Sequence, residues 1–221
     1  MIHGLIELEL FGQKLWITTT HVSMLIVMGI IILVACLIRA NLKGPDEKPG
    51  MLQSFAEIAI EMLENMVAGI MGDKGGKFIN YVGTIFVFIL LSNISGIFGL
   101  RPPTADFGVT LPLGIMTFLI VQYQNIKNNK FGAFTDLFQP MPVLFPINLI
   151  GEIATPFSLG LRLFGNIISG TVIVALFYGM VPVFVKIGVP AVLHAYFDLF
   201  SGCIQAYVFC MLTMVFINNK Q

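Results

Sequence analysis

Charged residues are scarce in this sequence. Only 11% of its 221 residues are Asp, Glu, Lys or Arg, whereas ordinary soluble domains carry about 25%. With a hydrophobic share of 57% and a mean hydropathy of +0.90, this scarcity excludes a soluble globular protein. Twelve basic residues balance twelve acidic ones, so the chain has neither a basic surface for nucleic acid nor the acidic excess of a disordered segment.

Cysteine is also rare, and the three cysteines have no metal-ligand or disulfide-framework spacing. Each lies in an apolar run, so we interpret them as small buried hydrophobic residues: Cys36, Cys203 and Cys210. The glycine-rich segment 72–76 lacks the spacing and the Ser or Thr of a phosphate-binding loop. We therefore expect no nucleotide site, no cofactor and no metal in this chain.

Long uncharged stretches are what the sequence has instead. A bilayer core takes about 20 helical residues to cross, and 24 residues without Asp, Glu, Lys or Arg separate Lys14 from Arg39. This first hydrophobic stretch lacks the basic region and cleavage site of a signal peptide, so we expect it to be retained in the protein. Together the stretches predict five membrane spans, at residues 15–38, 78–100, 108–126, 141–179 and 187–218.

Residues 51–71 predict a helix of another kind. An acidic and polar stripe recurs there at steps of four, four and three, formed by Gln53, Glu57, Glu61 and Glu64. The other faces are apolar, so we expect an amphipathic surface helix on the membrane or against a partner. Its acidity argues against simple anchoring to anionic lipid and favours a protein partner. A solvated face is the preferred interpretation of the stripe, over a direct part in chemistry.

The basic residues set an expected orientation, because cytoplasmic loops are enriched in Lys and Arg. If the spans alternate, three basic residues lie on one side: Lys14, Arg101 and Lys186. Eight lie on the other: Arg39, Lys43, Lys48, Lys74, Lys77, Lys127, Lys130 and Lys220. This distribution predicts an external N-terminus and a cytoplasmic C-terminus. The spans as a whole predict an all-α integral membrane protein with a single membrane domain over residues 1–221.

Two polar stripes follow the last two spans. The first has steps of four, three, seven, four and three and consists of Asn148, Glu152, Thr155, Arg162, Asn166 and Ser169. The second has steps of four, three and four and consists of His194, Asp198, Ser201 and Gln205. At these spacings each set lies on one helix face. Because ionisable residues in a membrane helix are costly, they are candidates for function, and we expect the stripes to face one another or a shared aqueous cleft.

Structural pairing is the alternative role for these charges. Glu152 and Arg162 lie ten residues, or about 15 Å, apart along one helix, so they cannot pair directly. A pair between Arg162 and Asp198 stays open. His194 is equally compatible with a position at the membrane interface. In the expected orientation Glu152 lies towards the cytoplasm, Arg162 near the middle of the membrane and Asp198 in the outer half.

The segment Ser158-Leu159-Gly160-Leu161-Arg162-Leu163-Phe164-Gly165-Asn166 resembles the signature of subunit a of the F-type ATP synthase membrane sector. A second match, Gln205-Ala206-Tyr207-Val208-Phe209, lies downstream, and the layout of spans agrees over nearly the whole chain. Arg162 matches the essential arginine of the family, Asn166 an asparagine one turn on, and Gln205 a glutamine of the last helix. Relatives often carry Glu where this chain has Thr171, and His or Glu where it has Asp198.

The resemblance implies a non-catalytic stator subunit, and the short chain without a targeting segment favours a bacterial inner membrane. Its last two spans would form a long tilted hairpin beside a rotating ring of c subunits, and two offset half-channels would carry H⁺ or Na⁺ to and from the ring carboxylates. The expected partners are this c-ring, b-type peripheral stalk subunits, the remainder of the F1Fo complex and the lipid bilayer. The ion path would use Arg162, Glu152, Asp198, Gln205, Asn166, His194, Ser201, Asn148 and Ser169.

Two other classes of protein remain as alternatives. A self-contained secondary transporter or ion channel would bind a substrate with the intramembrane charges near the midplane, although such folds often show paired halves and only one pair of spans is charged here. A structural membrane scaffold would have no reason to keep three charges in lipid. Copurification with an oligomeric ring and a soluble ATPase would separate the stator from both.

Overall fold

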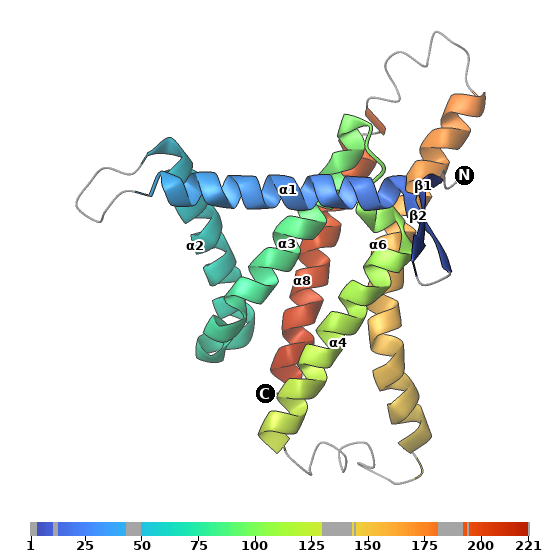
Figure 1. Ribbon diagram of the computed structural model, residues 1–221. Helices are drawn as coiled ribbons and strands as arrows, with labels where there is room; N and C mark the ends of the chain where they lie inside the picture. The colour runs from blue at the N-terminus through green and yellow to red at the C-terminus, as the bar shows by residue number, and fades with distance from the viewer. Residues whose placement is uncertain are drawn as a thin grey trace. The chain divides into compact units, whose positions relative to one another are not determined.

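A computed structural model describes residues 4–10, 13–42, 50–129, 143, 145–180, 192–193 and 195–220. It has two compact units, Met1–Pro103 and Thr104–Gln221, and each is described here by itself (Figure 1). In the described part, five helical segments are long and apolar enough to cross a membrane: Thr19–Ala40, Lys74–Phe98, Phe107–Asn128, Phe145–Met180 and Tyr196–Asn219. The expected fold class, an all-α integral membrane protein, is confirmed.

The first unit begins with a short antiparallel hairpin that the sequence analysis did not anticipate. Strand β1 (Gly4–Leu10) pairs with β2 (Gln13–Thr18), with Glu9 opposite Lys14 in the register. The alternation Ile6-Glu7-Leu8-Glu9-Leu10 is the period-two pattern of a strand. Helix α1 (Thr19–Ala40) therefore begins four residues later than expected, because residues 15–18 belong to β2.

Helix α2 (Met51–Met71) occupies the range expected for the surface helix. It is not among the five candidate spans, and its Glu57, Glu61 and Glu64 are exposed. Gln53, expected in the same solvated stripe, is buried. It ends at Gly72, whose positive φ of 59° is open to glycine at little cost. After this turn come the 3-10 helix η1 (Gly72–Phe78), α3 (Ile79–Ile94) and η2 (Ser95–Phe98), and α1, α2 and α3 contact one another.

The second unit holds α4 (Phe107–Asn129), α6 (Phe145–Met180), the π-helical segment η7 (Ala195–Ser201) and α8 (Gly202–Asn219). The short 3-10 turn η3 (Pro103–Ala105) stands at its start. Helices α6 and α8 contact each other and run in opposite directions (Figure 1). The expected start of the last span, residues 187–191, and His194 lie outside the described residues.

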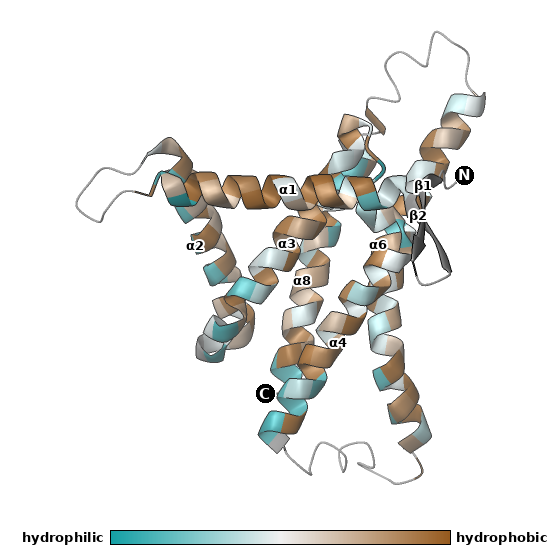
Figure 2. Ribbon diagram, in the orientation of Figure 1, coloured by the Kyte–Doolittle hydropathy of each residue, from teal (hydrophilic) through white to brown (hydrophobic). Residues whose placement is uncertain are grey.

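Two glycines let α4 and α6 approach closely. A Cβ on Gly114 would overlap the carbonyl oxygen of Pro156, and one on Gly160 would lie 3.1 Å from the Leu111 Cα and the Thr110 carbonyl oxygen. Contacts of this kind let membrane helices pack backbone to backbone. Figure 2 shows that the ends of α4 and α8 near the C-terminus are hydrophilic while their middles are more apolar. The Asn128 side chain donates a hydrogen bond to the Lys220 carbonyl oxygen at 3.2 Å there.

Candidate functional site

The first polar stripe runs along α6, a single helix of 36 residues. The helix stays continuous although Pro156 lies inside it and cannot donate a backbone hydrogen bond. Along the stripe the side chains of Asn148, Glu152, Thr155 and Asn166 are half-buried, and those of Arg162 and Ser169 are exposed. Several side chains of the stripe are therefore partly covered by other parts of the chain, whereas the Arg162 side chain is exposed.

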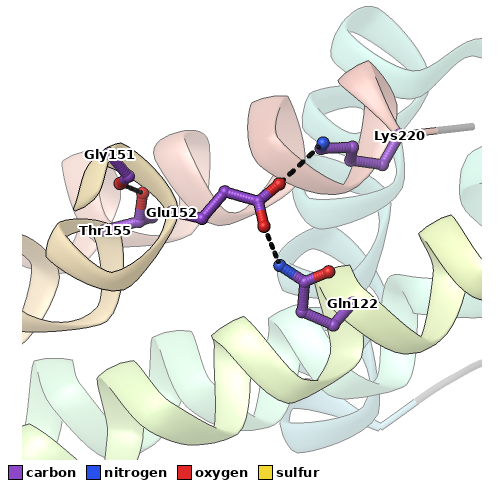
Figure 3. A network of polar contacts seen from close by, with 5 residues as sticks. All are labelled: Gln122, Gly151, Glu152, Thr155 and Lys220. Atoms are coloured by element: carbon purple, nitrogen blue, oxygen red, sulfur yellow. Dashed lines mark hydrogen bonds and ion pairs between the residues drawn. The ribbon is translucent and has the colours of Figure 1, made fainter. Parts of the chain in front are cut away.

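Glu152 is held by two other helices (Figure 3). Its Oε1 accepts a hydrogen bond from Lys220 Nζ at 3.1 Å, which is also an ion pair, and its Oε2 accepts one from Gln122 Nε2 at 3.1 Å. Gln122 belongs to α4 and Lys220 follows α8 directly. One turn along α6, the Thr155 hydroxyl donates to the Gly151 carbonyl oxygen at 3.0 Å. A carboxylate, an ammonium and an amide thus join three helix segments at one point.

Gln122 and Lys220 are two residues of this site that the sequence patterns do not predict. Lys220 is one of the basic residues that bear on orientation, and Gln122 lies in a span for which no polar stripe is predicted. A weak signal was present, since Gln122, Gln124 and Asn125 interrupt the apolar run of that span. Choosing among them requires the contact geometry: Asn125 is fully buried, while Gln122 reaches Glu152.

The two stripes meet at Asn166 and Ser201. Asn166 Nδ2 donates a hydrogen bond to Ser201 Oγ at 3.0 Å, and Ser201 Oγ donates one to Asn166 Oδ1 at 3.1 Å. The hydroxyl can serve both contacts because it is one donor and two acceptors. At this point, which is one turn from Arg162, the expectation that the stripes turn towards each other agrees with the geometry.

Arg162 forms no hydrogen bond or ion pair with another residue of the described part of the chain, so neither Glu152 nor Asp198 is its partner there. It borders a hollow of about 190 Å³ that is also lined by Ser158, Leu159 and Leu212. A second hollow of about 140 Å³ is bordered by Glu152, Gln122 and Lys220. Thr155 and Phe216 line both hollows, so the two adjoin and together extend from Glu152 to Arg162.

The other predicted site residues differ in burial and in the hydrogen bonds that they form. Asp198 is half-buried within η7 and Gln205 is buried in α8, where its Nε2 has no hydrogen-bond partner in the described structure. The hydroxyls of Ser169 and Thr171 bond back to the carbonyl oxygens three residues earlier, at 2.9 and 2.8 Å. His194 lies outside the described residues.

Within the described ranges, no group of three or more His, Cys, Asp or Glu side chains is placed to hold a metal ion. The three cysteines are free thiols; Cys210 is buried as expected, whereas Cys36 is exposed and its expected burial is wrong. The site is therefore composed of fixed charges and neutral hydrogen-bonding groups along hollows in an apolar helix bundle. The charged side chains along these hollows are the Glu152 carboxylate, the Lys220 ammonium and the Arg162 guanidinium.

Comparisons with known proteins agree with this arrangement. The family described as ATP synthase A chain matches residues 21–218. The chain is 39% identical to the ATP synthase subunit a, sodium ion specific, of Propionigenium modestum, over 92% of this chain and 74% of that one. It is 36% identical to the ATP synthase subunit a of Priestia megaterium, over 78% and 80% of the two chains. For the Bacillus subtilis subunit a the identity is 30% over 100% and 98%.

The family match covers nearly all of the chain, and these relatives are matched over most of their own length. Five candidate membrane spans and the arginine-bearing helix fit the same assignment. The chain belongs to the ATP synthase subunit a family, as a multi-pass membrane component of the F1Fo complex.

Proposed function

We propose that this chain is the non-catalytic, ion-translocating stator subunit of its ATP synthase. Two half-channels, offset in the membrane, would carry H⁺ or Na⁺ to and from carboxylates on the c-ring and so drive rotation. The proposal depends on the position of Arg162. Its guanidinium has no hydrogen-bond or ion-pair partner in the described structure, and it borders the hollow that lies next to the one at Glu152. A permanent cation in that position is what a barrier between two ion paths requires.

The cytoplasmic half-channel is proposed to follow these hollows. An ion released from a ring carboxylate near Arg162 would pass Thr155 and Phe216 and reach Glu152. The Glu152 carboxylate would attract a cation there, in a hollow that is otherwise lined by Lys220 and by neutral side chains. Asn148 lies one turn further along the same stripe and extends the polar surface towards the cytoplasm.

The outer half-channel is proposed to use the second stripe and Ser169. An entering ion would pass His194 and Asp198, then Ser201, Gln205 and Asn166, before it neutralises a ring carboxylate. Neutralisation is necessary because a bare charge facing lipid is expensive. Asp198 would supply the carboxylate that many relatives have where this chain has Thr171. The contact between Asn166 and Ser201 supports a polar meeting point at the inner end of this path.

Arg162 is proposed to do two things. It attracts the ionised form of a ring carboxylate and so promotes ion release, because an opposite charge within about 4 to 6 Å favours the charged state. It also repels a free cation, which prevents direct leakage between the two paths. Each unit charge that crosses about 100 mV then yields about 2.3 kcal/mol for rotation.

The wider assignments belong to the same proposal. The chain would act as one membrane domain in a bacterial inner membrane, with its N-terminus outside and its C-terminus in the cytoplasm. Its last two spans would form a tilted hairpin against the c-ring, with b-type stalk subunits attached. The coupling ion is H⁺ or Na⁺. A relative named as sodium ion specific makes Na⁺ the first ion to test.

The test is Arg162→Ala in the complete ATP synthase, reconstituted in vesicles. We expect ion-driven ATP synthesis to be abolished, because the barrier and the attraction for the ring carboxylate are both lost. Ser158→Ala is the matched control, since Ser158 lines the same hollow without a charge. Lysine is not a suitable control at position 162, because an ammonium lacks the planar fork of the guanidinium. Near-normal synthesis by the alanine variant would contradict the proposed role, and purification of the chain without a ring and ATPase would favour a self-contained transporter.

A further inference from the structure

Lys220 is the one charged residue that contacts Glu152 in the described structure, and the proposed ion path gives it no role. Its Nζ lies 3.1 Å from Glu152 Oε1, and the two side chains are 28% and 26% exposed. Both groups therefore lie partly at the surface of the chain. The pair is not enclosed within the helix bundle, which distinguishes it from a buried structural salt bridge.

The backbone of Lys220 is held in place while its side chain is exposed in part. The Lys220 carbonyl oxygen accepts a hydrogen bond from Asn128 Nδ2 at 3.2 Å, which ties the end of α8 to the end of α4. Gln122 Nε2, also on α4, occupies the second oxygen of Glu152. The lysine is thus held at its backbone with its ammonium at one carboxylate oxygen, and Gln122 contacts the other oxygen.

Glu152 and Lys220 are the two charged groups that line the hollow of about 140 Å³. The polar residues that line it with them are neutral: Thr117, Gln122, Thr155 and Asn219. Inside this hollow the Glu152 charge is consequently compensated by Lys220 and by no other charged side chain of the described part. A monovalent cation that enters from this end meets a carboxylate that already has a counterion.

We propose that Lys220 is the resident counterion of Glu152: its ammonium occupies the position at which a transported monovalent cation meets the carboxylate, and an ion passes by displacing it. This inference rests on the proposed function, since it names the competitor of the ion at the cytoplasmic end of the path. The competition weakens ion binding at Glu152, so that the ion is attracted to the hollow but is not retained there. Lys220 is therefore a positioning residue that sets ion affinity.

The test compares Lys220→Met with Lys220→Arg in the complete ATP synthase. In inverted membrane vesicles, ATP-driven uptake is measured while Na⁺ is titrated at constant pH and H⁺ at constant Na⁺, and the ion that supports uptake by the parent complex is used. We expect Lys220→Met to lower the half-saturating concentration of that ion about two- to five-fold, the scale of a partly exposed ion pair. The maximal rate stays near that of the parent, and Lys220→Arg keeps the parent value.

A second set of variants is made in the Glu152→Gln background. Without the Glu152 carboxylate, the Lys220 ammonium and the transported ion no longer compete for the same charged group. In that background Lys220→Met should leave the half-saturating concentration unchanged. If Lys220→Met does not accumulate in the complex, Lys220→Gln takes its place, since it keeps a donor to Glu152 and lacks the charge.

An unchanged half-saturating concentration with uptake intact would overturn the role of Lys220 alone. A shift that persists in the Glu152→Gln background would overturn it too, and so would a fall in maximal rate without a shift in affinity, the result expected of a purely structural lysine. Absence of uptake of either ion by the parent complex would overturn the proposed function together with this inference.

Discussion

At the residue scale, the reciprocal contact between Asn166 and Ser201 is the point at which the two polar stripes are joined. The hydrogen-bond distances are 3.0 and 3.1 Å, and both side chains are half-buried. Other polar groups compete for these side chains in the unfolded chain, so an interhelical hydrogen bond in a membrane protein contributes about 0.6 kcal/mol on average and at most about 1.7 kcal/mol.

We therefore predict a coupling free energy of about 0.6 to 1.7 kcal/mol between Asn166→Ala and Ser201→Ala. The measurement is the free energy of unfolding of the purified chain in mixed micelles titrated with sodium dodecyl sulfate, for both single variants and the double variant. Ser169→Ala is the control, because the Ser169 hydroxyl bonds within its own helix and its coupling to Ser201→Ala should be near zero. Equal coupling for both pairs would argue against a specific bond between the stripes.

Single polar residues in apolar spans could be identified from the sequence, but their partners could not. Glu152, Arg162 and Asn166 are conspicuous because a charge or amide in lipid is costly, and helical spacing places them on one face. Gln122 and Lys220 reach Glu152 from α4 and from the end of α8. Such contacts depend on how far each helix is rotated and shifted along its axis, and local spacing carries no information about that.

At the element scale, the pairing of α4 with α6 depends on the missing side chain of Gly114. A Cβ there would overlap the Pro156 carbonyl oxygen, which belongs to the rigid backbone and cannot move aside as a flexible side chain would. The contact between Gln122 and Glu152 lies on the same pair of helices, about two turns from Gly114 on α4 and about one turn from Pro156 on α6. Close packing of these helices is thus a condition for the site.

We predict that Gly114→Ala destabilises the chain by about 1 to 3 kcal/mol, the cost typical of overpacking. The unfolding titration measures this value, and the amount of the chain in purified complexes should fall with it. Gly165→Ala is the matched control, since a Cβ on Gly165 has open space within 4 Å and alanine favours the helix by up to about 1 kcal/mol over glycine. If the two alanine variants were equally stable, the close approach would not matter to stability.

Helix α2 has the expected range 51–71, whereas α4 (Phe107–Asn129) extends past the expected end at residue 126 and α6 (Phe145–Met180) begins four residues after the expected start at residue 141. Two local features escaped. The β1–β2 hairpin has an alternating pattern, but residues 15–18 of β2 are uncharged and apolar enough to be included in the expected first span. The π-helical η7 differs from an α-helix in its hydrogen-bond partners, which residue hydropathy does not reveal.

At the scale of the whole molecule, the number of spans follows from length and hydropathy, whereas the packing within each unit does not. All five expected spans have a counterpart in the described structure. Their sides of the membrane depend on the loops, and the basic residues of the loops are the one feature of the sequence that bears on orientation. The orientation is thus a prediction that needs a measurement of its own.

We predict that residue 127 faces the cytoplasm and residue 101 the opposite side. Lys127 lies in the last turn of α4 and Arg101 between α3 and α4, so the span α4 separates them. A chain without its three native cysteines would carry Lys127→Cys or Arg101→Cys, and a membrane-impermeant maleimide would be added to inverted vesicles, whose cytoplasmic face is outward. Cys at position 127 should be labelled before the vesicles are opened by detergent, and Cys at position 101 only afterwards. The reverse pattern would place Glu152 and Lys220 at the outer face, because Lys220 and Asn128 are hydrogen-bonded at the same end of the bundle, and the proposed direction of the ion path would then have to be inverted.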